Sequence, residues 1–245
     1  VLDSDEALLY VDFFGLKSDY IRNVLAPHYR HQLIVDNAQA LFTEPLPGIA
    51  TLYSPRKFVG VADGGWLVNA PDDLPPFAAS SSLARFSALL GRLEDSPQQH
   101  YAAFQDSELA LQTEGIKAIS VSTARVLDSL DYTQIARQRM ANLAQLRQRL
   151  DPLNRFSAWP AQRVAALCYP LLLACADSAE RLRRHLLEQT IFVPCYWQEV
   201  LSASATPDTE RSWAQCLLAL PIDQRYSVDD MNRLADIILQ HTRTS

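Results

Sequence analysis

The order of apolar runs in the first 36 residues constrains the fold more than any other feature of the sequence. Residues 7–14 form an apolar run of strand length, and residues 19–29 carry apolar side chains at helical spacing. Residues 32–35 then form a second short run, which ends at Asp36. Parallel strands need a crossover connection, usually a helix. The pattern therefore predicts a strand–helix–strand unit in a mainly parallel sheet, and an α/β fold class.

The rest of the chain continues this α/β pattern. Two further strands are expected at residues 49–53 and 59–68, and a long helical pattern at residues 82–150 ends before Pro152. Helices are expected at residues 176–188 and 228–241, the second with Ser227 as its N-cap. Three strands are expected in the C-terminal part, at residues 164–173, 191–196 and 216–221.

Composition and charge narrow the class of protein. The chain has 245 residues, of which 48% are hydrophobic, enough to bury a substantial core. Its net charge is -6 and its charges are interspersed, which argues against a nucleic-acid partner, and no apolar run is long enough to predict a membrane span. The four cysteines are dispersed without zinc-ligand spacing, so we expect no metal, reduced thiols and a cytoplasmic location.

Two histidines and an arginine are further candidates for binding a ligand. His28 and His31 have no third ligand at metal-binding spacing, so surface histidines are expected. Arg225 could contact a substrate phosphate or carboxylate, or form a salt bridge at the entry to the last helix.

Asp36 is the first candidate site residue. It follows a strand expected to be buried and parallel, and open α/β sheets bind their ligands at the carboxyl ends of such strands. A carboxylate at this place could bind a ligand, or it could cap the next segment. The residue alone leaves both interpretations open.

Lys57 is the second candidate. It stands near apolar residues and next to Arg56, and both partial burial and a neighbouring cation lower a lysine pKa and make the amine nucleophilic. A solvent-exposed loop lysine is the alternative. The Asp63-Gly64-Gly65 segment that follows could let the backbone approach a ligand closely, or could form a tight hairpin.

The combination of Asp36 and Lys57 indicates a specific chemistry. Pyridoxal phosphate (PLP) enzymes need an acid that keeps the pyridine nitrogen protonated and a lysine that holds the cofactor as a Schiff base and then moves protons. The sequence supplies an acid at the end of one strand and a lysine before a glycine-rich turn.

At these motifs the sequence resembles fold-type I PLP-dependent aminotransferases, and within them the nucleotide-sugar (DegT-like) aminotransferase family. Residues 35–40 (VDNAQA) are similar to the family's motif of an acid followed by Gln or His and Ala. Residues 57–65 (KFVGVADGG) are similar to its segment around the Schiff-base lysine. The resemblance also includes the entry to the last helix, and it extends in order over nearly the whole chain.

The resemblance implies roles for individual residues. Lys57 would be the catalytic Schiff-base lysine, Asp36 would contact the pyridine nitrogen, and Gln39 would lie beside the cofactor ring. The family's phosphate-binding serine is replaced by Leu52, so Thr51 or Ser54 would take that role. We expect that the family's N-terminal part, which contributes to phosphate binding and ring stacking, is missing from this chain.

The resemblance also implies a domain organisation and a function. We expect a partial PLP-binding large domain at residues 1–100, a helical connection at 101–150 and a small C-terminal α/β domain at 151–245. The expected activity is transfer of an amino group between a small-molecule amino donor and a keto-sugar or similar acceptor, in a homodimer. In related dehydrating enzymes a histidine replaces the lysine, so Lys57 favours transamination. The alternative is a truncated or degenerate PLP-fold protein with an assembly or regulatory role.

Overall fold

The computed structural model describes residues 2–161 and 163–244 and divides into two compact units, Val1–Tyr132 and Thr133–Ser245. The three domain ranges expected from the sequence remain a prediction. The helices and strands of the first unit are β1 (Leu8–Val11), α1 (Ser18–Tyr20), α2 (Ala26–Tyr29), β2 (Leu33–Asn37), β3 (Ala50–Tyr53), β4 (Trp66–Val68), α3 (Leu83–Glu94), α4 (Tyr101–Thr113) and α5 (Val121–Asp128). Those of the second are α6, which begins at the boundary (Tyr132–Leu150), β5 (Cys168–Leu172), α7 (Ala176–Glu188), α8 (Gln198–Ser202), α9 (Asp208–Cys216), β6 (Leu217–Pro221) and α10 (Val228–Thr244).

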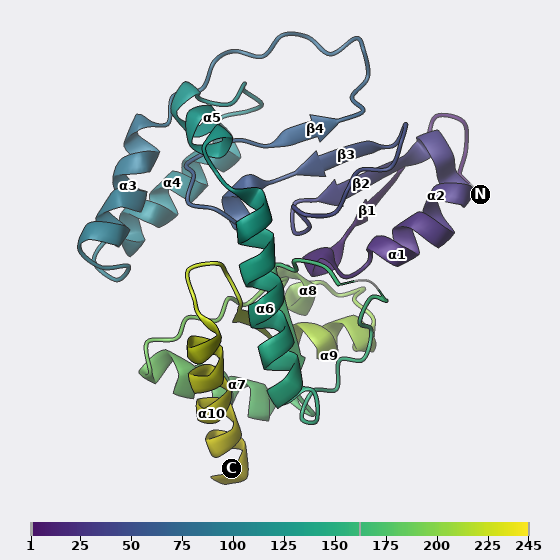
Figure 1. The fold of residues 1–245 in the computed structure, drawn as a ribbon. Helices are drawn as coiled ribbons and strands as arrows, with labels where there is room; N and C mark the ends of the chain where they lie inside the picture. The colour runs from purple at the N-terminus through teal and green to yellow at the C-terminus, as the bar shows by residue number, and fades with distance from the viewer. Residues whose placement is uncertain (1, 162, 245) are drawn as a thin grey trace. The chain divides into compact units, whose positions relative to one another are not determined.

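The first unit is built on a four-stranded sheet in the order β1-β2-β3-β4, which Figure 1 shows as neighbouring arrows. The first three strands are parallel to one another, and β4 runs antiparallel to β3. A helical stretch connects β1 to β2, with a π-helical turn (Ile21–Leu25) between α1 and α2. The predicted strand–helix–strand unit and the mainly parallel sheet are confirmed.

The core of this sheet lies against that helical stretch. Ile21 and Leu25 pack on Leu33, Val35 and Ile49, and all five side chains are buried. In β2 the buried residues alternate with the half-buried residues Ile34 and Asp36, because successive side chains of a strand point to opposite faces. The α1–α2 side of the sheet is therefore the apolar side, and Asp36 points to the other face.

The strand predicted at residues 59–68 was wrong for most of its length. Only Trp66–Val68 forms a strand, and residues 58–65 are an irregular loop. The physical reason is Gly64, whose φ of 97° is incompatible with a strand. The chain turns at this glycine and returns as the antiparallel strand β4.

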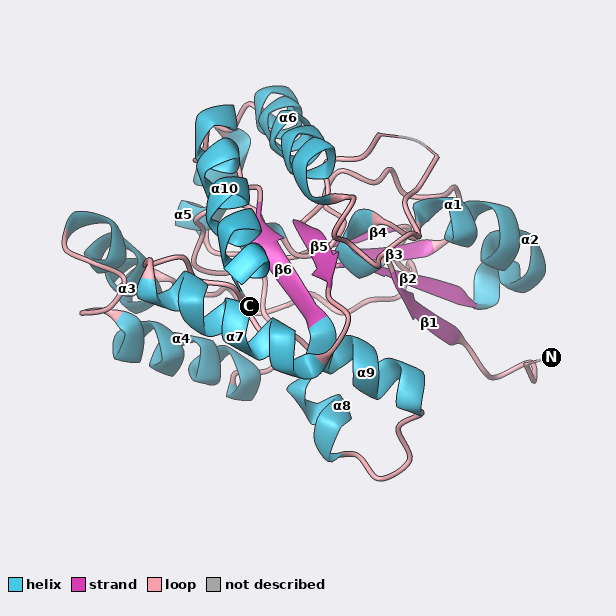
Figure 2. Ribbon diagram, turned by 90° about the horizontal axis from the view of Figure 1, so that it is seen from below, coloured by secondary structure: helices cyan, strands magenta, loops and turns pink. Residues whose placement is uncertain are grey.

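The second unit contains a two-stranded antiparallel sheet, β5-β6, in which every residue of β5 is buried. Figure 2 shows these two strands side by side, with α7 and α10 in the same unit. Helix α10 begins with a reciprocal cap: the Ser227 backbone N–H donates to Asp230 Oδ2 (2.9 Å), and the Asp230 N–H donates to Ser227 Oγ (3.2 Å). The predicted N-cap at Ser227 is confirmed.

The strand predicted at residues 191–196 was wrong. This segment has no regular secondary structure, although the strands predicted around residues 164–173 and 216–221 are present in shorter form as β5 and β6. Pro194 lies in the middle of the segment and has no N–H to donate to a neighbouring strand. Within residues 2–161 and 163–244, no helix has both the length and the apolarity needed to cross a membrane.

Candidate active site

The candidate site lies where the parallel strands of the first unit end. Asp36 is the fourth residue of β2, and a 3-10 turn, Pro55–Lys57, follows directly after β3. Because β2 and β3 are parallel, their carboxyl ends meet at one edge of the sheet. This is the edge at which open α/β sheets bind ligands, and it carries both residues that the sequence singled out.

Asp36 is half-buried and has spare hydrogen-bonding capacity. Its Oδ1 accepts a hydrogen bond from the backbone N–H of Ala38 at 2.8 Å. In the described part of the chain, no residue donates a hydrogen bond to its Oδ2. One oxygen thus orients the carboxylate, and the other is available to a ligand.

Lys57 interacts electrostatically with this carboxylate. Lys57 is an exposed residue, but neighbouring atoms partly desolvate its ammonium group and lower its pKa below the usual lysine value. The charge of Asp36 acts in the opposite direction and raises the pKa, and the charge of Arg56 lowers it further. Asp36 and Lys57 are therefore close enough to influence each other, and the structure brings these two predicted site residues together.

The two candidate phosphate contacts, Ser54 and Thr51, lie on different faces of the sheet. Asp36 pairs with Leu52, and Thr51 pairs with Val35, so Thr51 points to the α1–α2 side. Its hydroxyl donates to the carbonyl of Ile49 at 3.0 Å. Ser54 comes two residues after Leu52 on extended backbone (φ -127°, ψ 90°), which puts it on the Asp36 side. The structure thus groups Ser54, but not Thr51, with Asp36 and Lys57.

Gln39 is buried at the same edge and connects two loops. Its Oε1 accepts a hydrogen bond from the backbone N–H of Phe14 at 3.1 Å. Phe14 and Gly15 both have positive φ values, 59° and 79°, so this bond supports a sharply turned segment that follows β1. The side-chain oxygen of Gln39 is therefore already hydrogen-bonded to the backbone of this chain.

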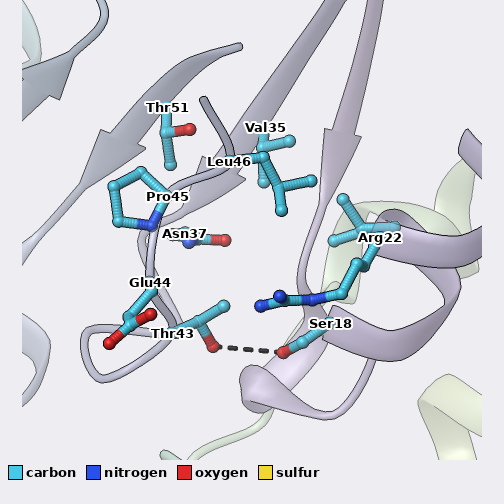
Figure 3. Close-up of a pocket in the computed structure, with 10 residues that line it drawn as sticks. Ser18, Arg22, Val35, Asn37, Thr43, Glu44, Pro45, Leu46 and Thr51 are labelled. Atoms are coloured by element: carbon cyan, nitrogen blue, oxygen red, sulfur yellow. Dashed lines mark hydrogen bonds between the residues drawn. The ribbon is translucent and has the colours of Figure 1, made fainter. Parts of the chain in front are cut away.

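The opposite face of the same edge holds a small polar cavity. Figure 3 shows Ser18, Asn37, Thr43 and Thr51 around it, and the hydroxyls of Ser18 and Thr43 lie 3.1 Å apart. The cavity has a volume of about 10 Å³, which is room for about one water molecule. The buried Asn37 lies at this cavity, and its Oδ1 atom has no hydrogen-bond partner among the described residues. A cofactor does not fit there.

Asp12 is the residue at this edge that the sequence analysis missed. It follows β1 directly, and its backbone N–H donates to the carbonyl of Asp36, the last residue but one of β2, at 3.0 Å. The signal was available, since Asp12 is the first carboxylate after the apolar run of residues 7–11. Its side chain lies on the Thr51 side, where it accepts from Ser18 Oγ at 2.7 Å.

Arg225, a possible anion contact, is engaged in the second unit. Its Nε and Nη2 donate to the two carboxylate oxygens of Asp223 at 2.8 and 3.0 Å. This bidentate pair is the salt bridge that the sequence left open as one of two interpretations.

Comparison with known proteins gave matches among solved structures alone. The sequence matches no family model and no curated protein sequence. Aminotransferase PseC from Helicobacter pylori, involved in the biosynthesis of pseudoaminic acid, is 12% identical, with a TM-score of 0.62 over 100% of this chain and 69% of that chain. Aminotransferase TlmJ from Streptoalloteichus hindustanus is 17% identical, with a TM-score of 0.62 over 99% of this chain and 68% of that chain.

A dehydratase shares the same fold. The E. coli GDP-4-keto-6-deoxy-D-mannose-3-dehydratase with bound hydrated PLP is 15% identical, with a TM-score of 0.60 over 97% of this chain and 68% of that chain. At these identities the likeness concerns the fold. The expected fold-type I arrangement is therefore confirmed, and this chain spans about two thirds of the length of the structures that share it.

Proposed function

We propose that this chain is a PLP-dependent aminotransferase that moves an amino group between an amino acid and a keto-sugar or similar carbonyl compound. The observation that carries the proposal is that Asp36, near the end of β2, and Lys57, in the turn after β3, lie at the carboxyl edge of the parallel strands and interact electrostatically. Aminotransferases share this fold. The two residues are therefore better explained as parts of a functional site than as chance neighbours on the surface.

The residues present fit PLP at its two reactive ends. The available oxygen of Asp36 suits a protonated ring nitrogen, and the amine of Lys57 suits the carbonyl carbon. Ser54 is the hydroxyl on the same face that could donate to the phosphate. Thr51, on the other face, is not part of this proposed set.

The environment of Lys57 favours its role as the group that binds the cofactor. A lowered pKa leaves a larger fraction of the amine neutral near pH 7, and the neutral amine is the nucleophile. The same amine can accept a proton from a substrate carbon and return it to another atom, because its pKa is moved toward neutral pH. Lys57 would thus hold the cofactor through its amine, and the same amine, once free, would carry the proton.

Asp36 has an electrostatic role in this proposal. Bound PLP supplies an electron sink for the electrons released when the substrate loses a proton. The charge of Asp36 would hold a proton at the ring nitrogen, and the bond from Ala38 N–H to the other oxygen keeps the carboxylate oriented. A charge-assisted hydrogen bond of this kind contributes about 1.5–3 kcal/mol.

The substrate class follows from the neighbours and from Lys57. PseC is involved in making pseudoaminic acid, and the dehydratase acts on a nucleotide-linked keto-sugar, as their names state. By resemblance to the family, a lysine at position 57 distinguishes transamination from the dehydrating reaction. We infer a keto-sugar as amino acceptor and an amino acid, such as glutamate, as donor.

We also propose that the protein is a homodimer located in the cytoplasm. The family resemblance supports the dimer, and sedimentation of the purified protein tests it. The four cysteines, of which Cys168 and Cys216 are buried, are free thiols, which suits a reducing compartment.

Visible absorption spectroscopy tests the proposed function. PLP is added to the wild-type protein, to Lys57→Ala and to the matched control Lys117→Ala. We expect a protein-dependent absorption band with the wild type and the control, its loss on addition of glutamate, and no such band with Lys57→Ala. Identical spectra for the wild type and Lys57→Ala would overturn the proposal.

A further inference from the structure

The turn that carries Lys57 is attached to the following helices by an ion pair. The guanidinium of Arg56, the residue next to Lys57, pairs with the carboxylate of Glu108 on α4, and both side chains are partly buried. Arg56 and Lys57 belong to the same 3-10 turn, Pro55–Lys57. The ion pair therefore restrains the backbone from which the Lys57 side chain extends.

A second attachment lies six residues after Lys57. Asp63 is 4% exposed, and its Oδ1 accepts a hydrogen bond from Ser120 Oγ, just before α5, at 2.9 Å. Its Oδ2 lies 3.6 Å from Nη2 of Arg85 on α3, which is 7% exposed. Arg85 is itself held by Glu114 at 3.0 Å. Removal of one partner from a buried ion pair of this kind destabilises the fold, because the other partner is left as an uncompensated buried charge.

The glycine turn beside Asp63 is tightly packed. A Cβ atom on Gly64 would lie 2.6 Å from Cδ1 of Ile119 and 3.3 Å from Cγ2 of Thr123 on α5. On Gly65 it would lie 3.0 Å from the carbonyl of Tyr53, the last residue of β3. The loop is therefore in direct contact with α5 and with the sheet, and it has little space to move.

We propose that α3, α4 and α5 hold the Lys57 loop at two points, Arg56 and Asp63, and that Glu108 and Asp63 are positioning residues for the Lys57 amine. The inference rests on the proposed function, which gives the position of this amine its importance. A lysine side chain is flexible along four carbons, and a reacting group displaced by about 1 Å loses much of its rate. A loop held on both sides keeps the amine beside Asp36.

The proposal predicts that the pKa of Lys57 rises when Glu108 is replaced, whereas the loss of charge alone would lower it. Glu108→Gln removes the negative charge that pairs with Arg56, and by charge alone this would lower the lysine pKa. If Glu108 positions the loop, its loss frees the turn and reduces the desolvation of the Lys57 ammonium group, so the pKa rises toward the usual lysine value. The two roles therefore give changes of opposite sign.

Competitive acetylation with acetic anhydride at a series of pH values measures this change without any cofactor. The chain has three lysines, Lys17, Lys57 and Lys117, and mass spectrometry follows each separately. The variants are Glu108→Gln and the matched control Asp106→Asn, which removes the same charge from an exposed position on α4. Asp63→Asn tests the second attachment, with Lys17 as its reference.

We expect the labelling of Lys57 below its pKa to fall about three- to tenfold in Glu108→Gln and in Asp63→Asn, since one pKa unit changes the free amine tenfold. Lys17 should be unaffected, and Asp106→Asn should behave as the wild type. Increased or unchanged labelling of Lys57 in Glu108→Gln, or an equal effect of Asp106→Asn, would overturn the proposal. Trapping of PLP on Lys57 is a separate measurement that tests the proposed function. Failure of the positioning role of Glu108 and Asp63 can therefore be told apart from failure of the proposed function.

Discussion

Asp12 and Asp36 both lie at the carboxyl ends of adjacent parallel strands, yet they are offset by one position and their surroundings differ. Asp36 is level with Val11, the last residue of β1, and Asp12 follows one position later, so their side chains point to opposite faces of the sheet. Asp12 is fully buried, and its oxygens accept hydrogen bonds from Lys17 N–H, Ser18 Oγ and Thr43 Oγ1 at 2.6, 2.7 and 3.4 Å. Among the described residues, the one donor to the Asp36 carboxylate is the Ala38 N–H.

The difference separates a carboxylate that maintains the fold from one that is available to a ligand. Burial raises the pKa of Asp12, and the hydrogen bonds from Ser18, Lys17 and Thr43 offset part of that rise. The three hydrogen bonds of Asp12 join the segment after β1 to Thr43. Asp36 has one oxygen available and interacts electrostatically with Lys57. The comparison thus assigns Asp12 to the fold and leaves Asp36 as the candidate ligand-binding acid.

The largest expected effect on stability comes from removing the buried acid. Asp12→Ala removes the acceptor of the Lys17 N–H and of two hydroxyls, which can partly compensate by bonding to each other, and should lower the free energy of unfolding by about 2 kcal/mol. Asp36→Ala removes one bond at a half-buried position and should cost about 1 kcal/mol or less. Urea denaturation of both variants measures the loss of unfolding free energy. Equal losses for the two variants would contradict the distinction between Asp12 and Asp36.

The next effect concerns catalysis. Asp36→Asn keeps the shape of the side chain but removes its charge, and transamination should slow about 10- to 100-fold, which corresponds to about 1.5–3 kcal/mol. Asp72→Asn, an exposed acid in the loop after β4, is the matched control and should retain the wild-type rate. A wild-type rate for Asp36→Asn would refute its role.

A smaller effect, on PLP affinity, should distinguish the hydroxyl groups on the two faces of the sheet. Ser54→Ala should weaken PLP binding about tenfold, or about 1.4 kcal/mol, because a donor to the phosphate is lost. Thr51→Val should leave PLP binding unchanged and lower stability by about 1 kcal/mol, since its hydroxyl bonds to Ile49. Titration of PLP into both variants checks this, and the reverse order of affinities would assign the phosphate to the other face.

The smallest effect is a pH dependence of stability. Since the pKa of Asp12 is raised in the folded protein, its contribution to stability is fully present below the ordinary aspartate pKa and is lost as the pH rises through the folded value. From about pH 4 upward, the wild type should lose stability relative to Asp12→Asn, and urea denaturation across this range measures it. A difference with the opposite slope would contradict the raised pKa.

The sequence predicted Asp36 and Lys57 as candidate site residues but not the contacts that hold them in place. Asp36 and Lys57 could be found because each follows a recognisable apolar run. Thr51 and Ser54 could not be separated without the register of β2 and β3, since a shift of one residue exchanges the faces. The contacts of Glu108 and Asp63 join residues more than fifty positions apart, and local patterns carry no information about such pairs.

Borohydride reduction of the protein with PLP, followed by peptide mapping, tests the central claim most directly. With three lysines in the chain, the product can be assigned without ambiguity. The account predicts that the phosphopyridoxyl group is on Lys57 and that Lys57→Ala is not labelled. Labelling of Lys17 or Lys117 in its place, or no labelling of the wild type, would contradict it.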